Sequence, residues 1–423
     1  MSNRFNQALN YFTQGRIPVI LVWSCLLLES VGTMVEIPVA LMALLGIGLV
    51  VKRGKKLIWQ GGGRLFSIFF LLVWVPGLIS LPLAFSPAKA VIGILIIPRF
   101  YFAGLFIIAT FDTPGRHQQL LRLASWVLLF WVGDALVQSV FGINLLGYHS
   151  PPSHVNGVFG ERHIYLGSYL AVFSPLLLLY AQRKWSVWAQ SLIFGAVWIV
   201  ILLAGSRAGW IIFSVVLVAY FAFLLKENRQ FAMRAAIGVM VVLVFGIIIG
   251  YHFSSGFDAR LRLTMSVFNG GERTVNAAMT DRIPIWMATV KMIADHPWTG
   301  VGVRCFPYVY PQYAAPDDRF VNHGEGTGAT HAHQLLLEVA AVSGMVGLVG
   351  LLGVFFMLIT SWRQAEKDRR QWMLPYGLAL CGILFPFNST FAFYSSAWSQ
   401  VFFWFVSLYL ASSQHSLSMI EST

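Results

Sequence analysis

The sequence predicts an all-α, polytopic membrane protein with about twelve membrane-spanning helices. Of its 423 residues, 57% are hydrophobic and only 11% are charged, a composition that soluble domains do not have. Apolar stretches of about 17 to 25 residues recur along nearly the whole chain, each long enough to cross a hydrocarbon core about 30 Å thick. The Lys and Arg residues form short clusters between these stretches, so the formal charge of +12 indicates membrane topology and not nucleic-acid binding.

The apolar stretches place the spans in order along the chain. They are predicted at residues 17–30, 34–51, 65–85, 90–112, 118–141, 164–182, 185–204, 208–225, 233–253, 334–360, 373–390 and 396–412. No small-residue cleavage signature follows the first stretch, so we expect an uncleaved first span. The chain then divides into residues 1–253 with spans 1–9, a large loop at 254–333, and residues 334–423 with spans 10–12.

Basic residues predict the sidedness of the connections. Short connections rich in Lys and Arg occur at residues 52–64, 116–122, 183–184, 226–234 and 363–370, and they alternate with connections that have few charges. The positive-inside rule places the basic connections and both termini in the cytoplasm. The two long connections, at 142–163 and 254–333, are therefore expected outside.

The large outer loop contains one predicted helix, from about Arg282 to Ala294. Thr280 or Asp281 is its expected N-cap, and the stretch from 296 to 300 ends it with His-Pro and Gly. Apolar residues recur at spacings of three or four, which predicts an amphipathic helix on the membrane surface or on the tops of the spans. These residues are Ile283, Trp286, Val290 and Ile293.

Two arginines are candidates for binding an anion at the outer surface. Arg207 lies in the tight turn LLAGSRAGW, where small residues allow a ligand to approach and a new helix offers its free N–H groups. Arg282 occupies the first turn of the loop helix. The alternatives are that Arg207 is a snorkelling or helix-capping residue, and that Arg282 is solvated or paired with Asp281.

Other charged residues are candidates for substrate binding with a structural alternative beside each. Arg99 lies inside an apolar run, where an arginine is either functional or paired, here with Glu36. The first outer loop, NGVFGERHIYLGSYLA, places Glu161 and His163 against the start of a span, or it is an ordinary polar loop. Arg304 belongs to the recurring arginines of the large loop.

His331 and His333 stand directly before the tenth span, and three roles compete for them. Two residues apart, they share no helix face, but in an extended segment their rings project to the same side and could chelate a metal with His323, Glu325 or Asp317. A structural role is the second possibility. The third is a neutral imidazole that acts as a general base near neutral pH.

A base beside two arginines predicts a reaction class. Each arginine can stabilise a phosphorylated leaving group by on the order of 4 kcal/mol at about 4 Å and an effective dielectric near 20, before desolvation is subtracted. One base and two cations at the outer surface of a membrane therefore indicate transfer from a lipid diphosphate.

Several motifs resemble those of the O-antigen ligase and polymerase superfamily. HQLLLEVAAVSG is similar to the pattern HNxxLxxxxexG, with His333 at the histidine and Gln334 where Asn is usual. DRIPIWMATVKMIADHPWTGVG is similar to RxxxWxxAxxxxxxHPxxGxG and aligns Arg282, and the GSRAG turn aligns Arg207. NGVFGERHIYLGSYLA resembles GxFxNPNxLGxYL. The resemblance covers about residues 150 to 350.

The resemblance implies a glycosyltransferase of GT-C-like architecture in the bacterial inner membrane, with its active site on the periplasmic side. It implies transfer of a glycan from undecaprenyl diphosphate without a cofactor or metal. The chain length, the GSRAGW turn and the late HxH favour a ligase, whose acceptor is lipid A-core oligosaccharide. A polymerase and a protein O-oligosaccharyltransferase are the alternatives within the superfamily. A lipid-linked glycan transporter is an alternative outside it, which would keep its charges near the bilayer midplane.

The resulting mechanistic expectation assigns a role to each candidate residue. His333 is the general base of an inverting transfer, and Arg207 and Arg282 hold the diphosphate. The remaining candidates are expected to bind substrate. They are Arg99, Glu161, His163, His331 and Arg304.

Overall fold

A computed structural model of the chain describes residues 3–151, 153–161, 164–253, 255–265, 276, 279, 281–390 and 392–413. The regular elements in these residues are helices, with two isolated β-bridges, Ile143 with His149 and Asn322 with Thr327. The predicted all-α class is confirmed for the described residues.

A helix, or in one case a pair of helices, lies at the position of every predicted span. These are α2 (Ile17–Leu28), α3 (Glu36–Arg53), α5 (Gly61–Ser80), α6 (Pro87–Leu95) with α7 (Pro98–Thr110), α8 (Pro114–Phe141), α9 (Leu166–Lys184), α10 (Val187–Leu203), α11 (Arg207–Glu227), α12 (Arg229–Phe253), α17 (Leu335–Gln364), α18 (Lys367–Ile383) and α19 (Ser396–Ser412). The shorter elements are α1 (Asn3–Thr13), η1 (Gly32–Val35), α4 (Lys55–Trp59), η2 (Leu81–Leu83), η3 (Gly157–Phe159), α13 (Ser255–Met265), α15 (Arg282–Asp295) and α16 (Phe306–Tyr313).

Six helices of the described chain are long and apolar enough to cross a membrane. They are Gly32–Arg53, Gly61–Leu83, Pro87–Thr110, Pro114–Phe141, Arg207–Glu227 and Leu335–Gln364. Shorter apolar helices occur at Ile17–Leu28, Val187–Leu203 and Ala235–Ile248. The chain is a helical membrane protein, and the twelve crossings stay a prediction.

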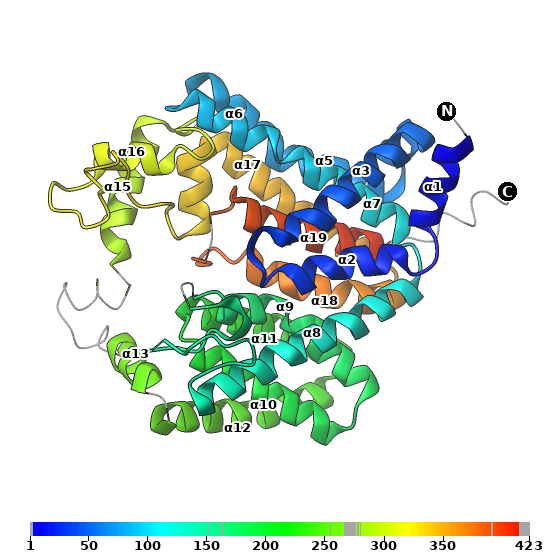
Figure 1. Cartoon of the computed structure of the whole chain (residues 1–423), viewed down its shortest axis with the longest axis vertical. Coiled ribbons are helices and arrows are strands. Elements are labelled where there is room, and N and C mark those ends of the chain that lie inside the picture. The colour runs from blue at the N-terminus through cyan, green and yellow to red at the C-terminus, as the bar shows by residue number, and fades with distance from the viewer. Residues whose placement is uncertain are drawn as a thin grey trace.

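The core of the bundle is formed by α9 and α19. Every residue of α19 from Trp398 to Ser412 is buried, and so is α9 from Leu166 to Leu177. In Figure 1, α19 lies among α2, α5, α7 and α18, while α9 lies with α8, α10 and α11 in the other half of the molecule. In lipid, the association of helices is stabilised by close packing and not by the exclusion of water from apolar surfaces.

Glycines permit the closest helix contacts. A Cβ at Gly209 of α11 would lie 2.7 Å from the backbone of Gly167 in α9. A Cβ at Gly350 of α17 would lie 2.2 Å from the carbonyl oxygen of Leu72 in α5. These pairs fix the two helices that carry site residues, α11 and α17, against the rest of the bundle.

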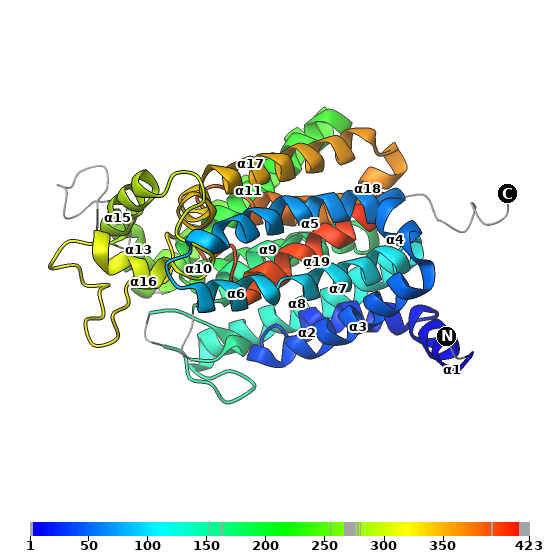
Figure 2. The ribbon, with the colours of Figure 1, turned by 90° about the horizontal axis from the view of Figure 1, so that it is seen from above.

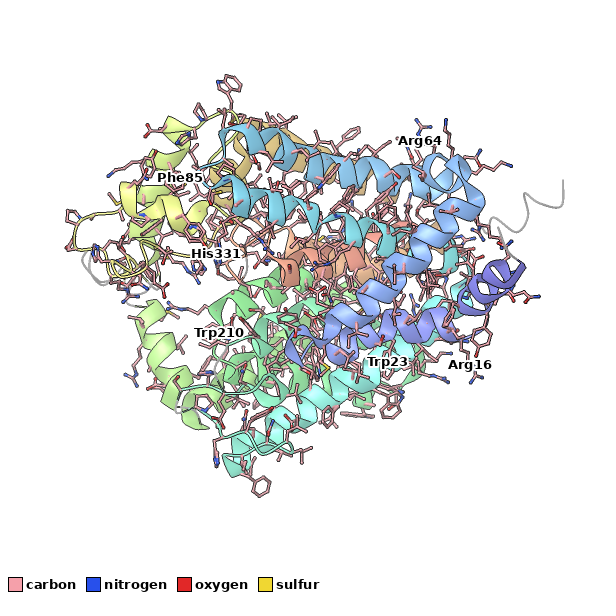
Figure 3. All side chains as sticks on the ribbon, turned by 45° about the horizontal axis from the view of Figure 1, so that its top comes forward. Arg16, Trp23, Arg64, Phe85, Trp210 and His331 are labelled. Carbon is pink, nitrogen blue, oxygen red and sulfur yellow. The ribbon has the colours of Figure 1, made fainter. Side chains whose placement is uncertain are left out.

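The two ends of the bundle differ. Figure 2 shows α13, α15 and α16 at one end and α1 and α4 at the opposite end. In Figure 3 the labelled His331, Phe85 and Trp210 lie at the first end, whereas Arg16 and Arg64 lie at the second. We call them the histidine end and the basic end.

Helix α15 lies where the sequence predicts it, but its fully buried residues are not those of the predicted apolar stripe. The buried residues are Ile285, Ala288, Thr289 and Met292, whereas Val290 of the predicted apolar stripe is 55% exposed. The other three residues of the stripe, Ile283, Trp286 and Ile293, are half-buried. The helix packs on α16 and α17. Asp281 is the N-cap, but its side chain makes no capping bond and pairs with Arg319 at 2.7 Å instead.

Candidate functional site

The stretch HPWTGVG, residues 296–302, is bonded into a break in α17. Gly344 interrupts this helix with φ +64°, which frees backbone groups that would otherwise bond within the helix. Four backbone hydrogen bonds use them, from Met345 N to Pro297 O (2.8 Å), Val346 N to Trp298 O (3.3 Å), Val301 N to Ala341 O (2.8 Å) and Gly302 N to Val342 O (3.1 Å). The large loop is thereby fixed to the helix that follows the histidines.

Glycine is required on both sides of this junction. Gly300 has φ +65°, and a Cβ there would lie 2.5 Å from the carbonyl oxygen of Ala341. A Cβ on Gly344 would lie 2.3 Å from the backbone of Trp298. The glycines of the HPxxGxG motif and of the histidine motif are therefore required because the backbones of the two motifs pack directly against each other.

The segment that carries the histidines is not helical, and its backbone is held from several sides. The carbonyl of Ala332 accepts from the indole N–H of Trp286 at 3.0 Å, and the Ala332 N–H donates to Oε2 of Glu338 at 2.7 Å. Gln334 is the N-cap of α17, and its side-chain oxygen accepts from Leu337 N. Gln334 therefore keeps the capping role although the family pattern has Asn here.

His333 is held in a strained conformation with one ring nitrogen engaged. Its φ is +54°, which is unfavourable for a residue with a side chain, and such strained residues cluster at functional sites. Its Nδ1 lies 3.0 Å from the carbonyl oxygen of Ser389. A carbonyl only accepts, so Nδ1 carries the proton and Nε2 keeps its lone pair. No described residue forms a hydrogen bond with Nε2 of His333.

The electrostatic surroundings keep His333 neutral near pH 7. Burial lowers its pKa below the usual 6.5, and the charge of Arg282 lowers it further, while the bond to Ser389 acts in the opposite direction. A neutral ring with a free Nε2 is the form that a general base requires.

His331 lies directly against His333. The two ring centroids are 3.8 Å apart with 44° between the planes, so the rings do lie together as an extended segment would place them. Nδ1 of His331 lies 3.0 Å from Oγ1 of Thr330, and its Nε2 is buried without a hydrogen-bond partner among the described residues. Burial, His333 and Arg282 together hold the pKa of His331 well below its usual value.

The two predicted arginines lie close to this pair. Arg282 begins α15, and burial together with the charge of Arg207 lowers its pKa to about 10. Arg282 in turn acts on both histidines. Arg207 begins α11, whose N-cap Ser206 accepts from Gly209 N at 3.2 Å. Arg282 is thus coupled to Arg207 and to both histidines, and the four residues lie at or just before the N-termini of α11, α15 and α17.

Hydroxyl groups connect the Arg207 turn to the support of His333. Oγ of Ser206 lies 3.0 Å from Oγ of Ser168 in α9, and Ser168 accepts from Oγ1 of Thr390 at 3.0 Å. Thr390 follows Ser389, whose carbonyl holds the His333 ring. The His333 ring and the Arg207 turn are therefore connected through Ser168 and the segment Ser389–Thr390.

The remaining candidates lie in different surroundings. Arg99 forms an ion pair with Glu36, with 2.6 Å between Nη2 and Oε1. This is the pairing that the sequence offered as the alternative to substrate binding by Arg99. Glu161 accepts from His149 N at 2.8 Å within the first outer loop. His163 lies outside the described residues. Arg304 has φ +62° and donates to Oγ of Ser396 at 3.2 Å.

The metal alternative finds no ligand cluster in the described part of the chain. No group of three or more His, Cys, Asp or Glu residues there is arranged to hold a metal ion. The pair His331 and His333 is thus not joined by His323, Glu325 or Asp317.

The sequence reasoning missed three positioning residues. Glu338 holds the backbone of the histidine segment, and its signal was an acidic residue within an apolar helix, HQLLLEVAAVSG. Ser389 and Ser168 had no such signal. Ser389 acts through its backbone carbonyl, which any residue carries, Ser168 is one of several small hydroxyl residues in the helices, and the partners of both are remote in sequence. In the first outer loop, Asn156 accepts from Tyr165 N at 3.2 Å and shapes the turn before α9.

These features define a helical membrane protein with two neutral histidine rings and two arginines at one end of its bundle. Residues 191–352 match the model of a family described as O-antigen ligase. The match includes Arg207, Arg282, His331 and His333, and it supports membership of the chain in the O-antigen ligase and polymerase superfamily. The resemblance drawn from the sequence is thereby confirmed at that level. The family consists of glycosyltransferase-like enzymes of lipopolysaccharide and glycan synthesis. No curated protein matches the chain.

Proposed function

We propose that this protein is an O-antigen ligase, which moves O-antigen polysaccharide from undecaprenyl diphosphate to lipid A-core oligosaccharide at the periplasmic face of the bacterial inner membrane. The reaction is inverting and independent of a metal. The observation that carries the proposal is the neutral His333 ring, with Nε2 free, next to two partly buried arginines. A base and an anion site are the two elements that such a transfer needs.

His333 acts on the acceptor. Its Nε2 takes the proton of an acceptor sugar hydroxyl while the hydroxyl oxygen forms a bond to the anomeric carbon of the donor glycan. The bond from that carbon to the diphosphate oxygen breaks on the opposite face, so the configuration inverts. The Nδ1 bond to Ser389 keeps the ring oriented and favours the protonated ring once the proton has been transferred.

Arg207 and Arg282 act on the leaving group. The two cations repel each other and have lost hydration, so a diphosphate that neutralises both is favoured, and more so as charge develops on it during bond breaking. The N-terminal N–H groups of α11 add to this anion site. The undecaprenyl chain would extend from here between the helices into the bilayer.

The difference between the two ends of the bundle supports an orientation in the membrane. We propose twelve crossings with both termini in the cytoplasm, and with the loops 142–163 and 254–333 in the periplasm. The basic end, which would be cytoplasmic, carries ion pairs such as Lys367 with Glu227 (3.2 Å). Arg207, Arg282, His331 and His333 begin or precede helices at the opposite end, which supports an enzyme over a transporter.

Deletion of the gene tests the proposal against the polymerase alternative. Loss of a ligase leaves bare lipid A-core while full-length polymer accumulates on undecaprenyl diphosphate. Loss of a polymerase leaves core that carries a single repeat, and that result would replace the proposed activity. Transfer by purified protein is expected to persist in EDTA, and Arg207→Lys is expected to reduce it because a point charge replaces a bidentate fork.

A further inference from the structure

A cavity opens beside His331, on the side of α16 and α17. Its volume is about 410 Å³. Hydroxyl side chains form much of its wall, together with one arginine, one carboxylate and one imidazole. The residues that matter here are Arg304, His331, Glu338, Thr330, Thr390 and Ser396.

Arg304 gives this cavity a positive charge that is not neutralised. Its Nη2 donates to Oγ of Ser396, and no carboxylate of the described chain lies within ion-pair distance of its guanidinium. Glu338 lines the same cavity, but its Oε2 is engaged by the backbone N–H of Ala332. A guanidinium with free N–H donors in a partly enclosed, hydroxyl-lined space is suited to bind an anion.

The position of Arg304 is built into the fold. Its backbone has φ +62°, and its side-chain stem packs on α6, where a Cβ at Gly93 would come within 3.1 Å of Cδ. Arg304 follows the 296–302 stretch that is bonded into the break of α17. The same junction therefore positions the arginine and the histidine segment.

His331 supplies the second observation. It is 9% exposed, it lines this cavity, and its Nε2 has no partner among the described residues. Leaving a buried polar atom without a hydrogen bond is costly. A sugar hydroxyl relieves this cost in either tautomer, because a hydroxyl both donates and accepts.

We propose that this cavity binds the acceptor, and that it selects a sugar with an anionic substituent, a phosphate or a carboxylate, close to the attacking hydroxyl. Arg304 binds the anion and Nε2 of His331 binds a hydroxyl of the same sugar. The His333 ring, with its centroid 3.8 Å from that of His331, then lies next to the acceptor. This inference rests on the proposed function and divides the charged residues into a donor set, Arg207 and Arg282, and an acceptor set.

Equilibrium binding without donor lipid tests the division directly. The probe is purified lipid A-core oligosaccharide, offered to the full-length protein intact, after phosphatase treatment, and after reduction of its carboxylates. Wild type is expected to lose about tenfold to a hundredfold in affinity when the anion that Arg304 binds is removed. The treatment that causes this loss identifies the anion as phosphate or carboxylate.

Variants of Arg304, measured with the intact and the treated oligosaccharide, test whether Arg304 is the residue that binds the anion. Arg304→Gln is expected to bind the intact oligosaccharide as weakly as wild type binds the oligosaccharide that has lost its anion. Removal of that anion should not weaken binding to Arg304→Gln any further. Arg304→Lys keeps the charge and should recover part of the affinity. Arg319→Gln is the matched control, since Arg319 lies in the same loop with 62% of its side chain exposed, and it should behave as wild type. Melting temperatures check that each variant is folded.

Transfer kinetics distinguish this inference from its competitor, in which Arg304 belongs to the donor site. Arg304→Gln and His331→Ala should raise KM for the acceptor and leave KM for the donor lipid within about twofold of wild type. A raised donor KM, or equal affinity of wild type for intact and treated probes, would overturn the acceptor assignment. Failure of wild type to transfer to lipid A-core would instead overturn the proposed function, and the binding measurements would still decide the role of Arg304.

Discussion

Replacement of Arg282 by methionine should make the protein more stable and less active. The pKa of Arg282 falls from its usual value to about 10, through burial first and the charge of Arg207 second. One pKa unit corresponds to about 1.36 kcal/mol, so below pH 10 the folded protein holds this cation at a cost of about 3 kcal/mol. Because the side chain keeps part of its contact with water, we expect a gain of about 2 kcal/mol when the charge is removed.

Thermal unfolding in detergent measures this gain. Arg282→Met should raise Tm by several degrees, since no described group loses a hydrogen bond, while transfer falls by about 10² to 10³. Added undecaprenyl diphosphate should raise the Tm of wild type but not that of the variant. Arg319→Met is the control, because its exposed ion pair with Asp281 contributes only about 0 to 1 kcal/mol and its removal should give no gain. A lower Tm for Arg282→Met would contradict this reasoning, because it would show that Arg282 stabilises the folded protein instead of destabilising it.

Two further predictions concern the base and the loop junction. Transfer should fall in acid as His333 is protonated, with a midpoint below pH 6.5 because burial and Arg282 lower its pKa. Arg282→Gln should move the midpoint of the kcat/KM profile to higher pH, and an unmoved midpoint would contradict the assignment of the titrating group. Gly300→Ala should cost about 3 kcal/mol or more of stability, through left-handed strain and loss of buried backbone bonds. The control Gly133→Ala should cost nothing, because a Cβ there meets no atom within 4 Å, and equal losses in the two variants would refute the proposed junction.

The sequence was sufficient for features that depend on local patterns. Apolar runs predicted where the helices lie, and the capping position and the His-Pro end predicted α15 to within a residue or two. The buried face of α15 could not be predicted in the same way. Hydrophobic periodicity favours large residues such as Val290, whereas the buried residues of α15 include the small Ala288 and Thr289.

In the candidate site, too, the residues with a local sequence signal were predicted and the contacts between remote segments were not. His333, Arg207 and Arg282 stood out because each is a charged or titratable residue next to small residues or a helix start. The Ser389 carbonyl and the Ser168 hydroxyl could not be found, because these contacts join parts of the chain that are remote in sequence. Arg99 was undecided on sequence alone, since only a structure places the Glu36 carboxylate beside it.

Single-turnover transfer by purified His333→Ala tests the central claim most directly. Donor lipid and acceptor are mixed with wild type, with His333→Ala, and with His323→Ala as a control for an exposed histidine of the same loop. We predict that His333→Ala retains binding of the donor lipid but loses transfer by about 10² to 10⁴, while His323→Ala transfers as wild type does. Transfer by His333→Ala at the wild-type rate would contradict the account.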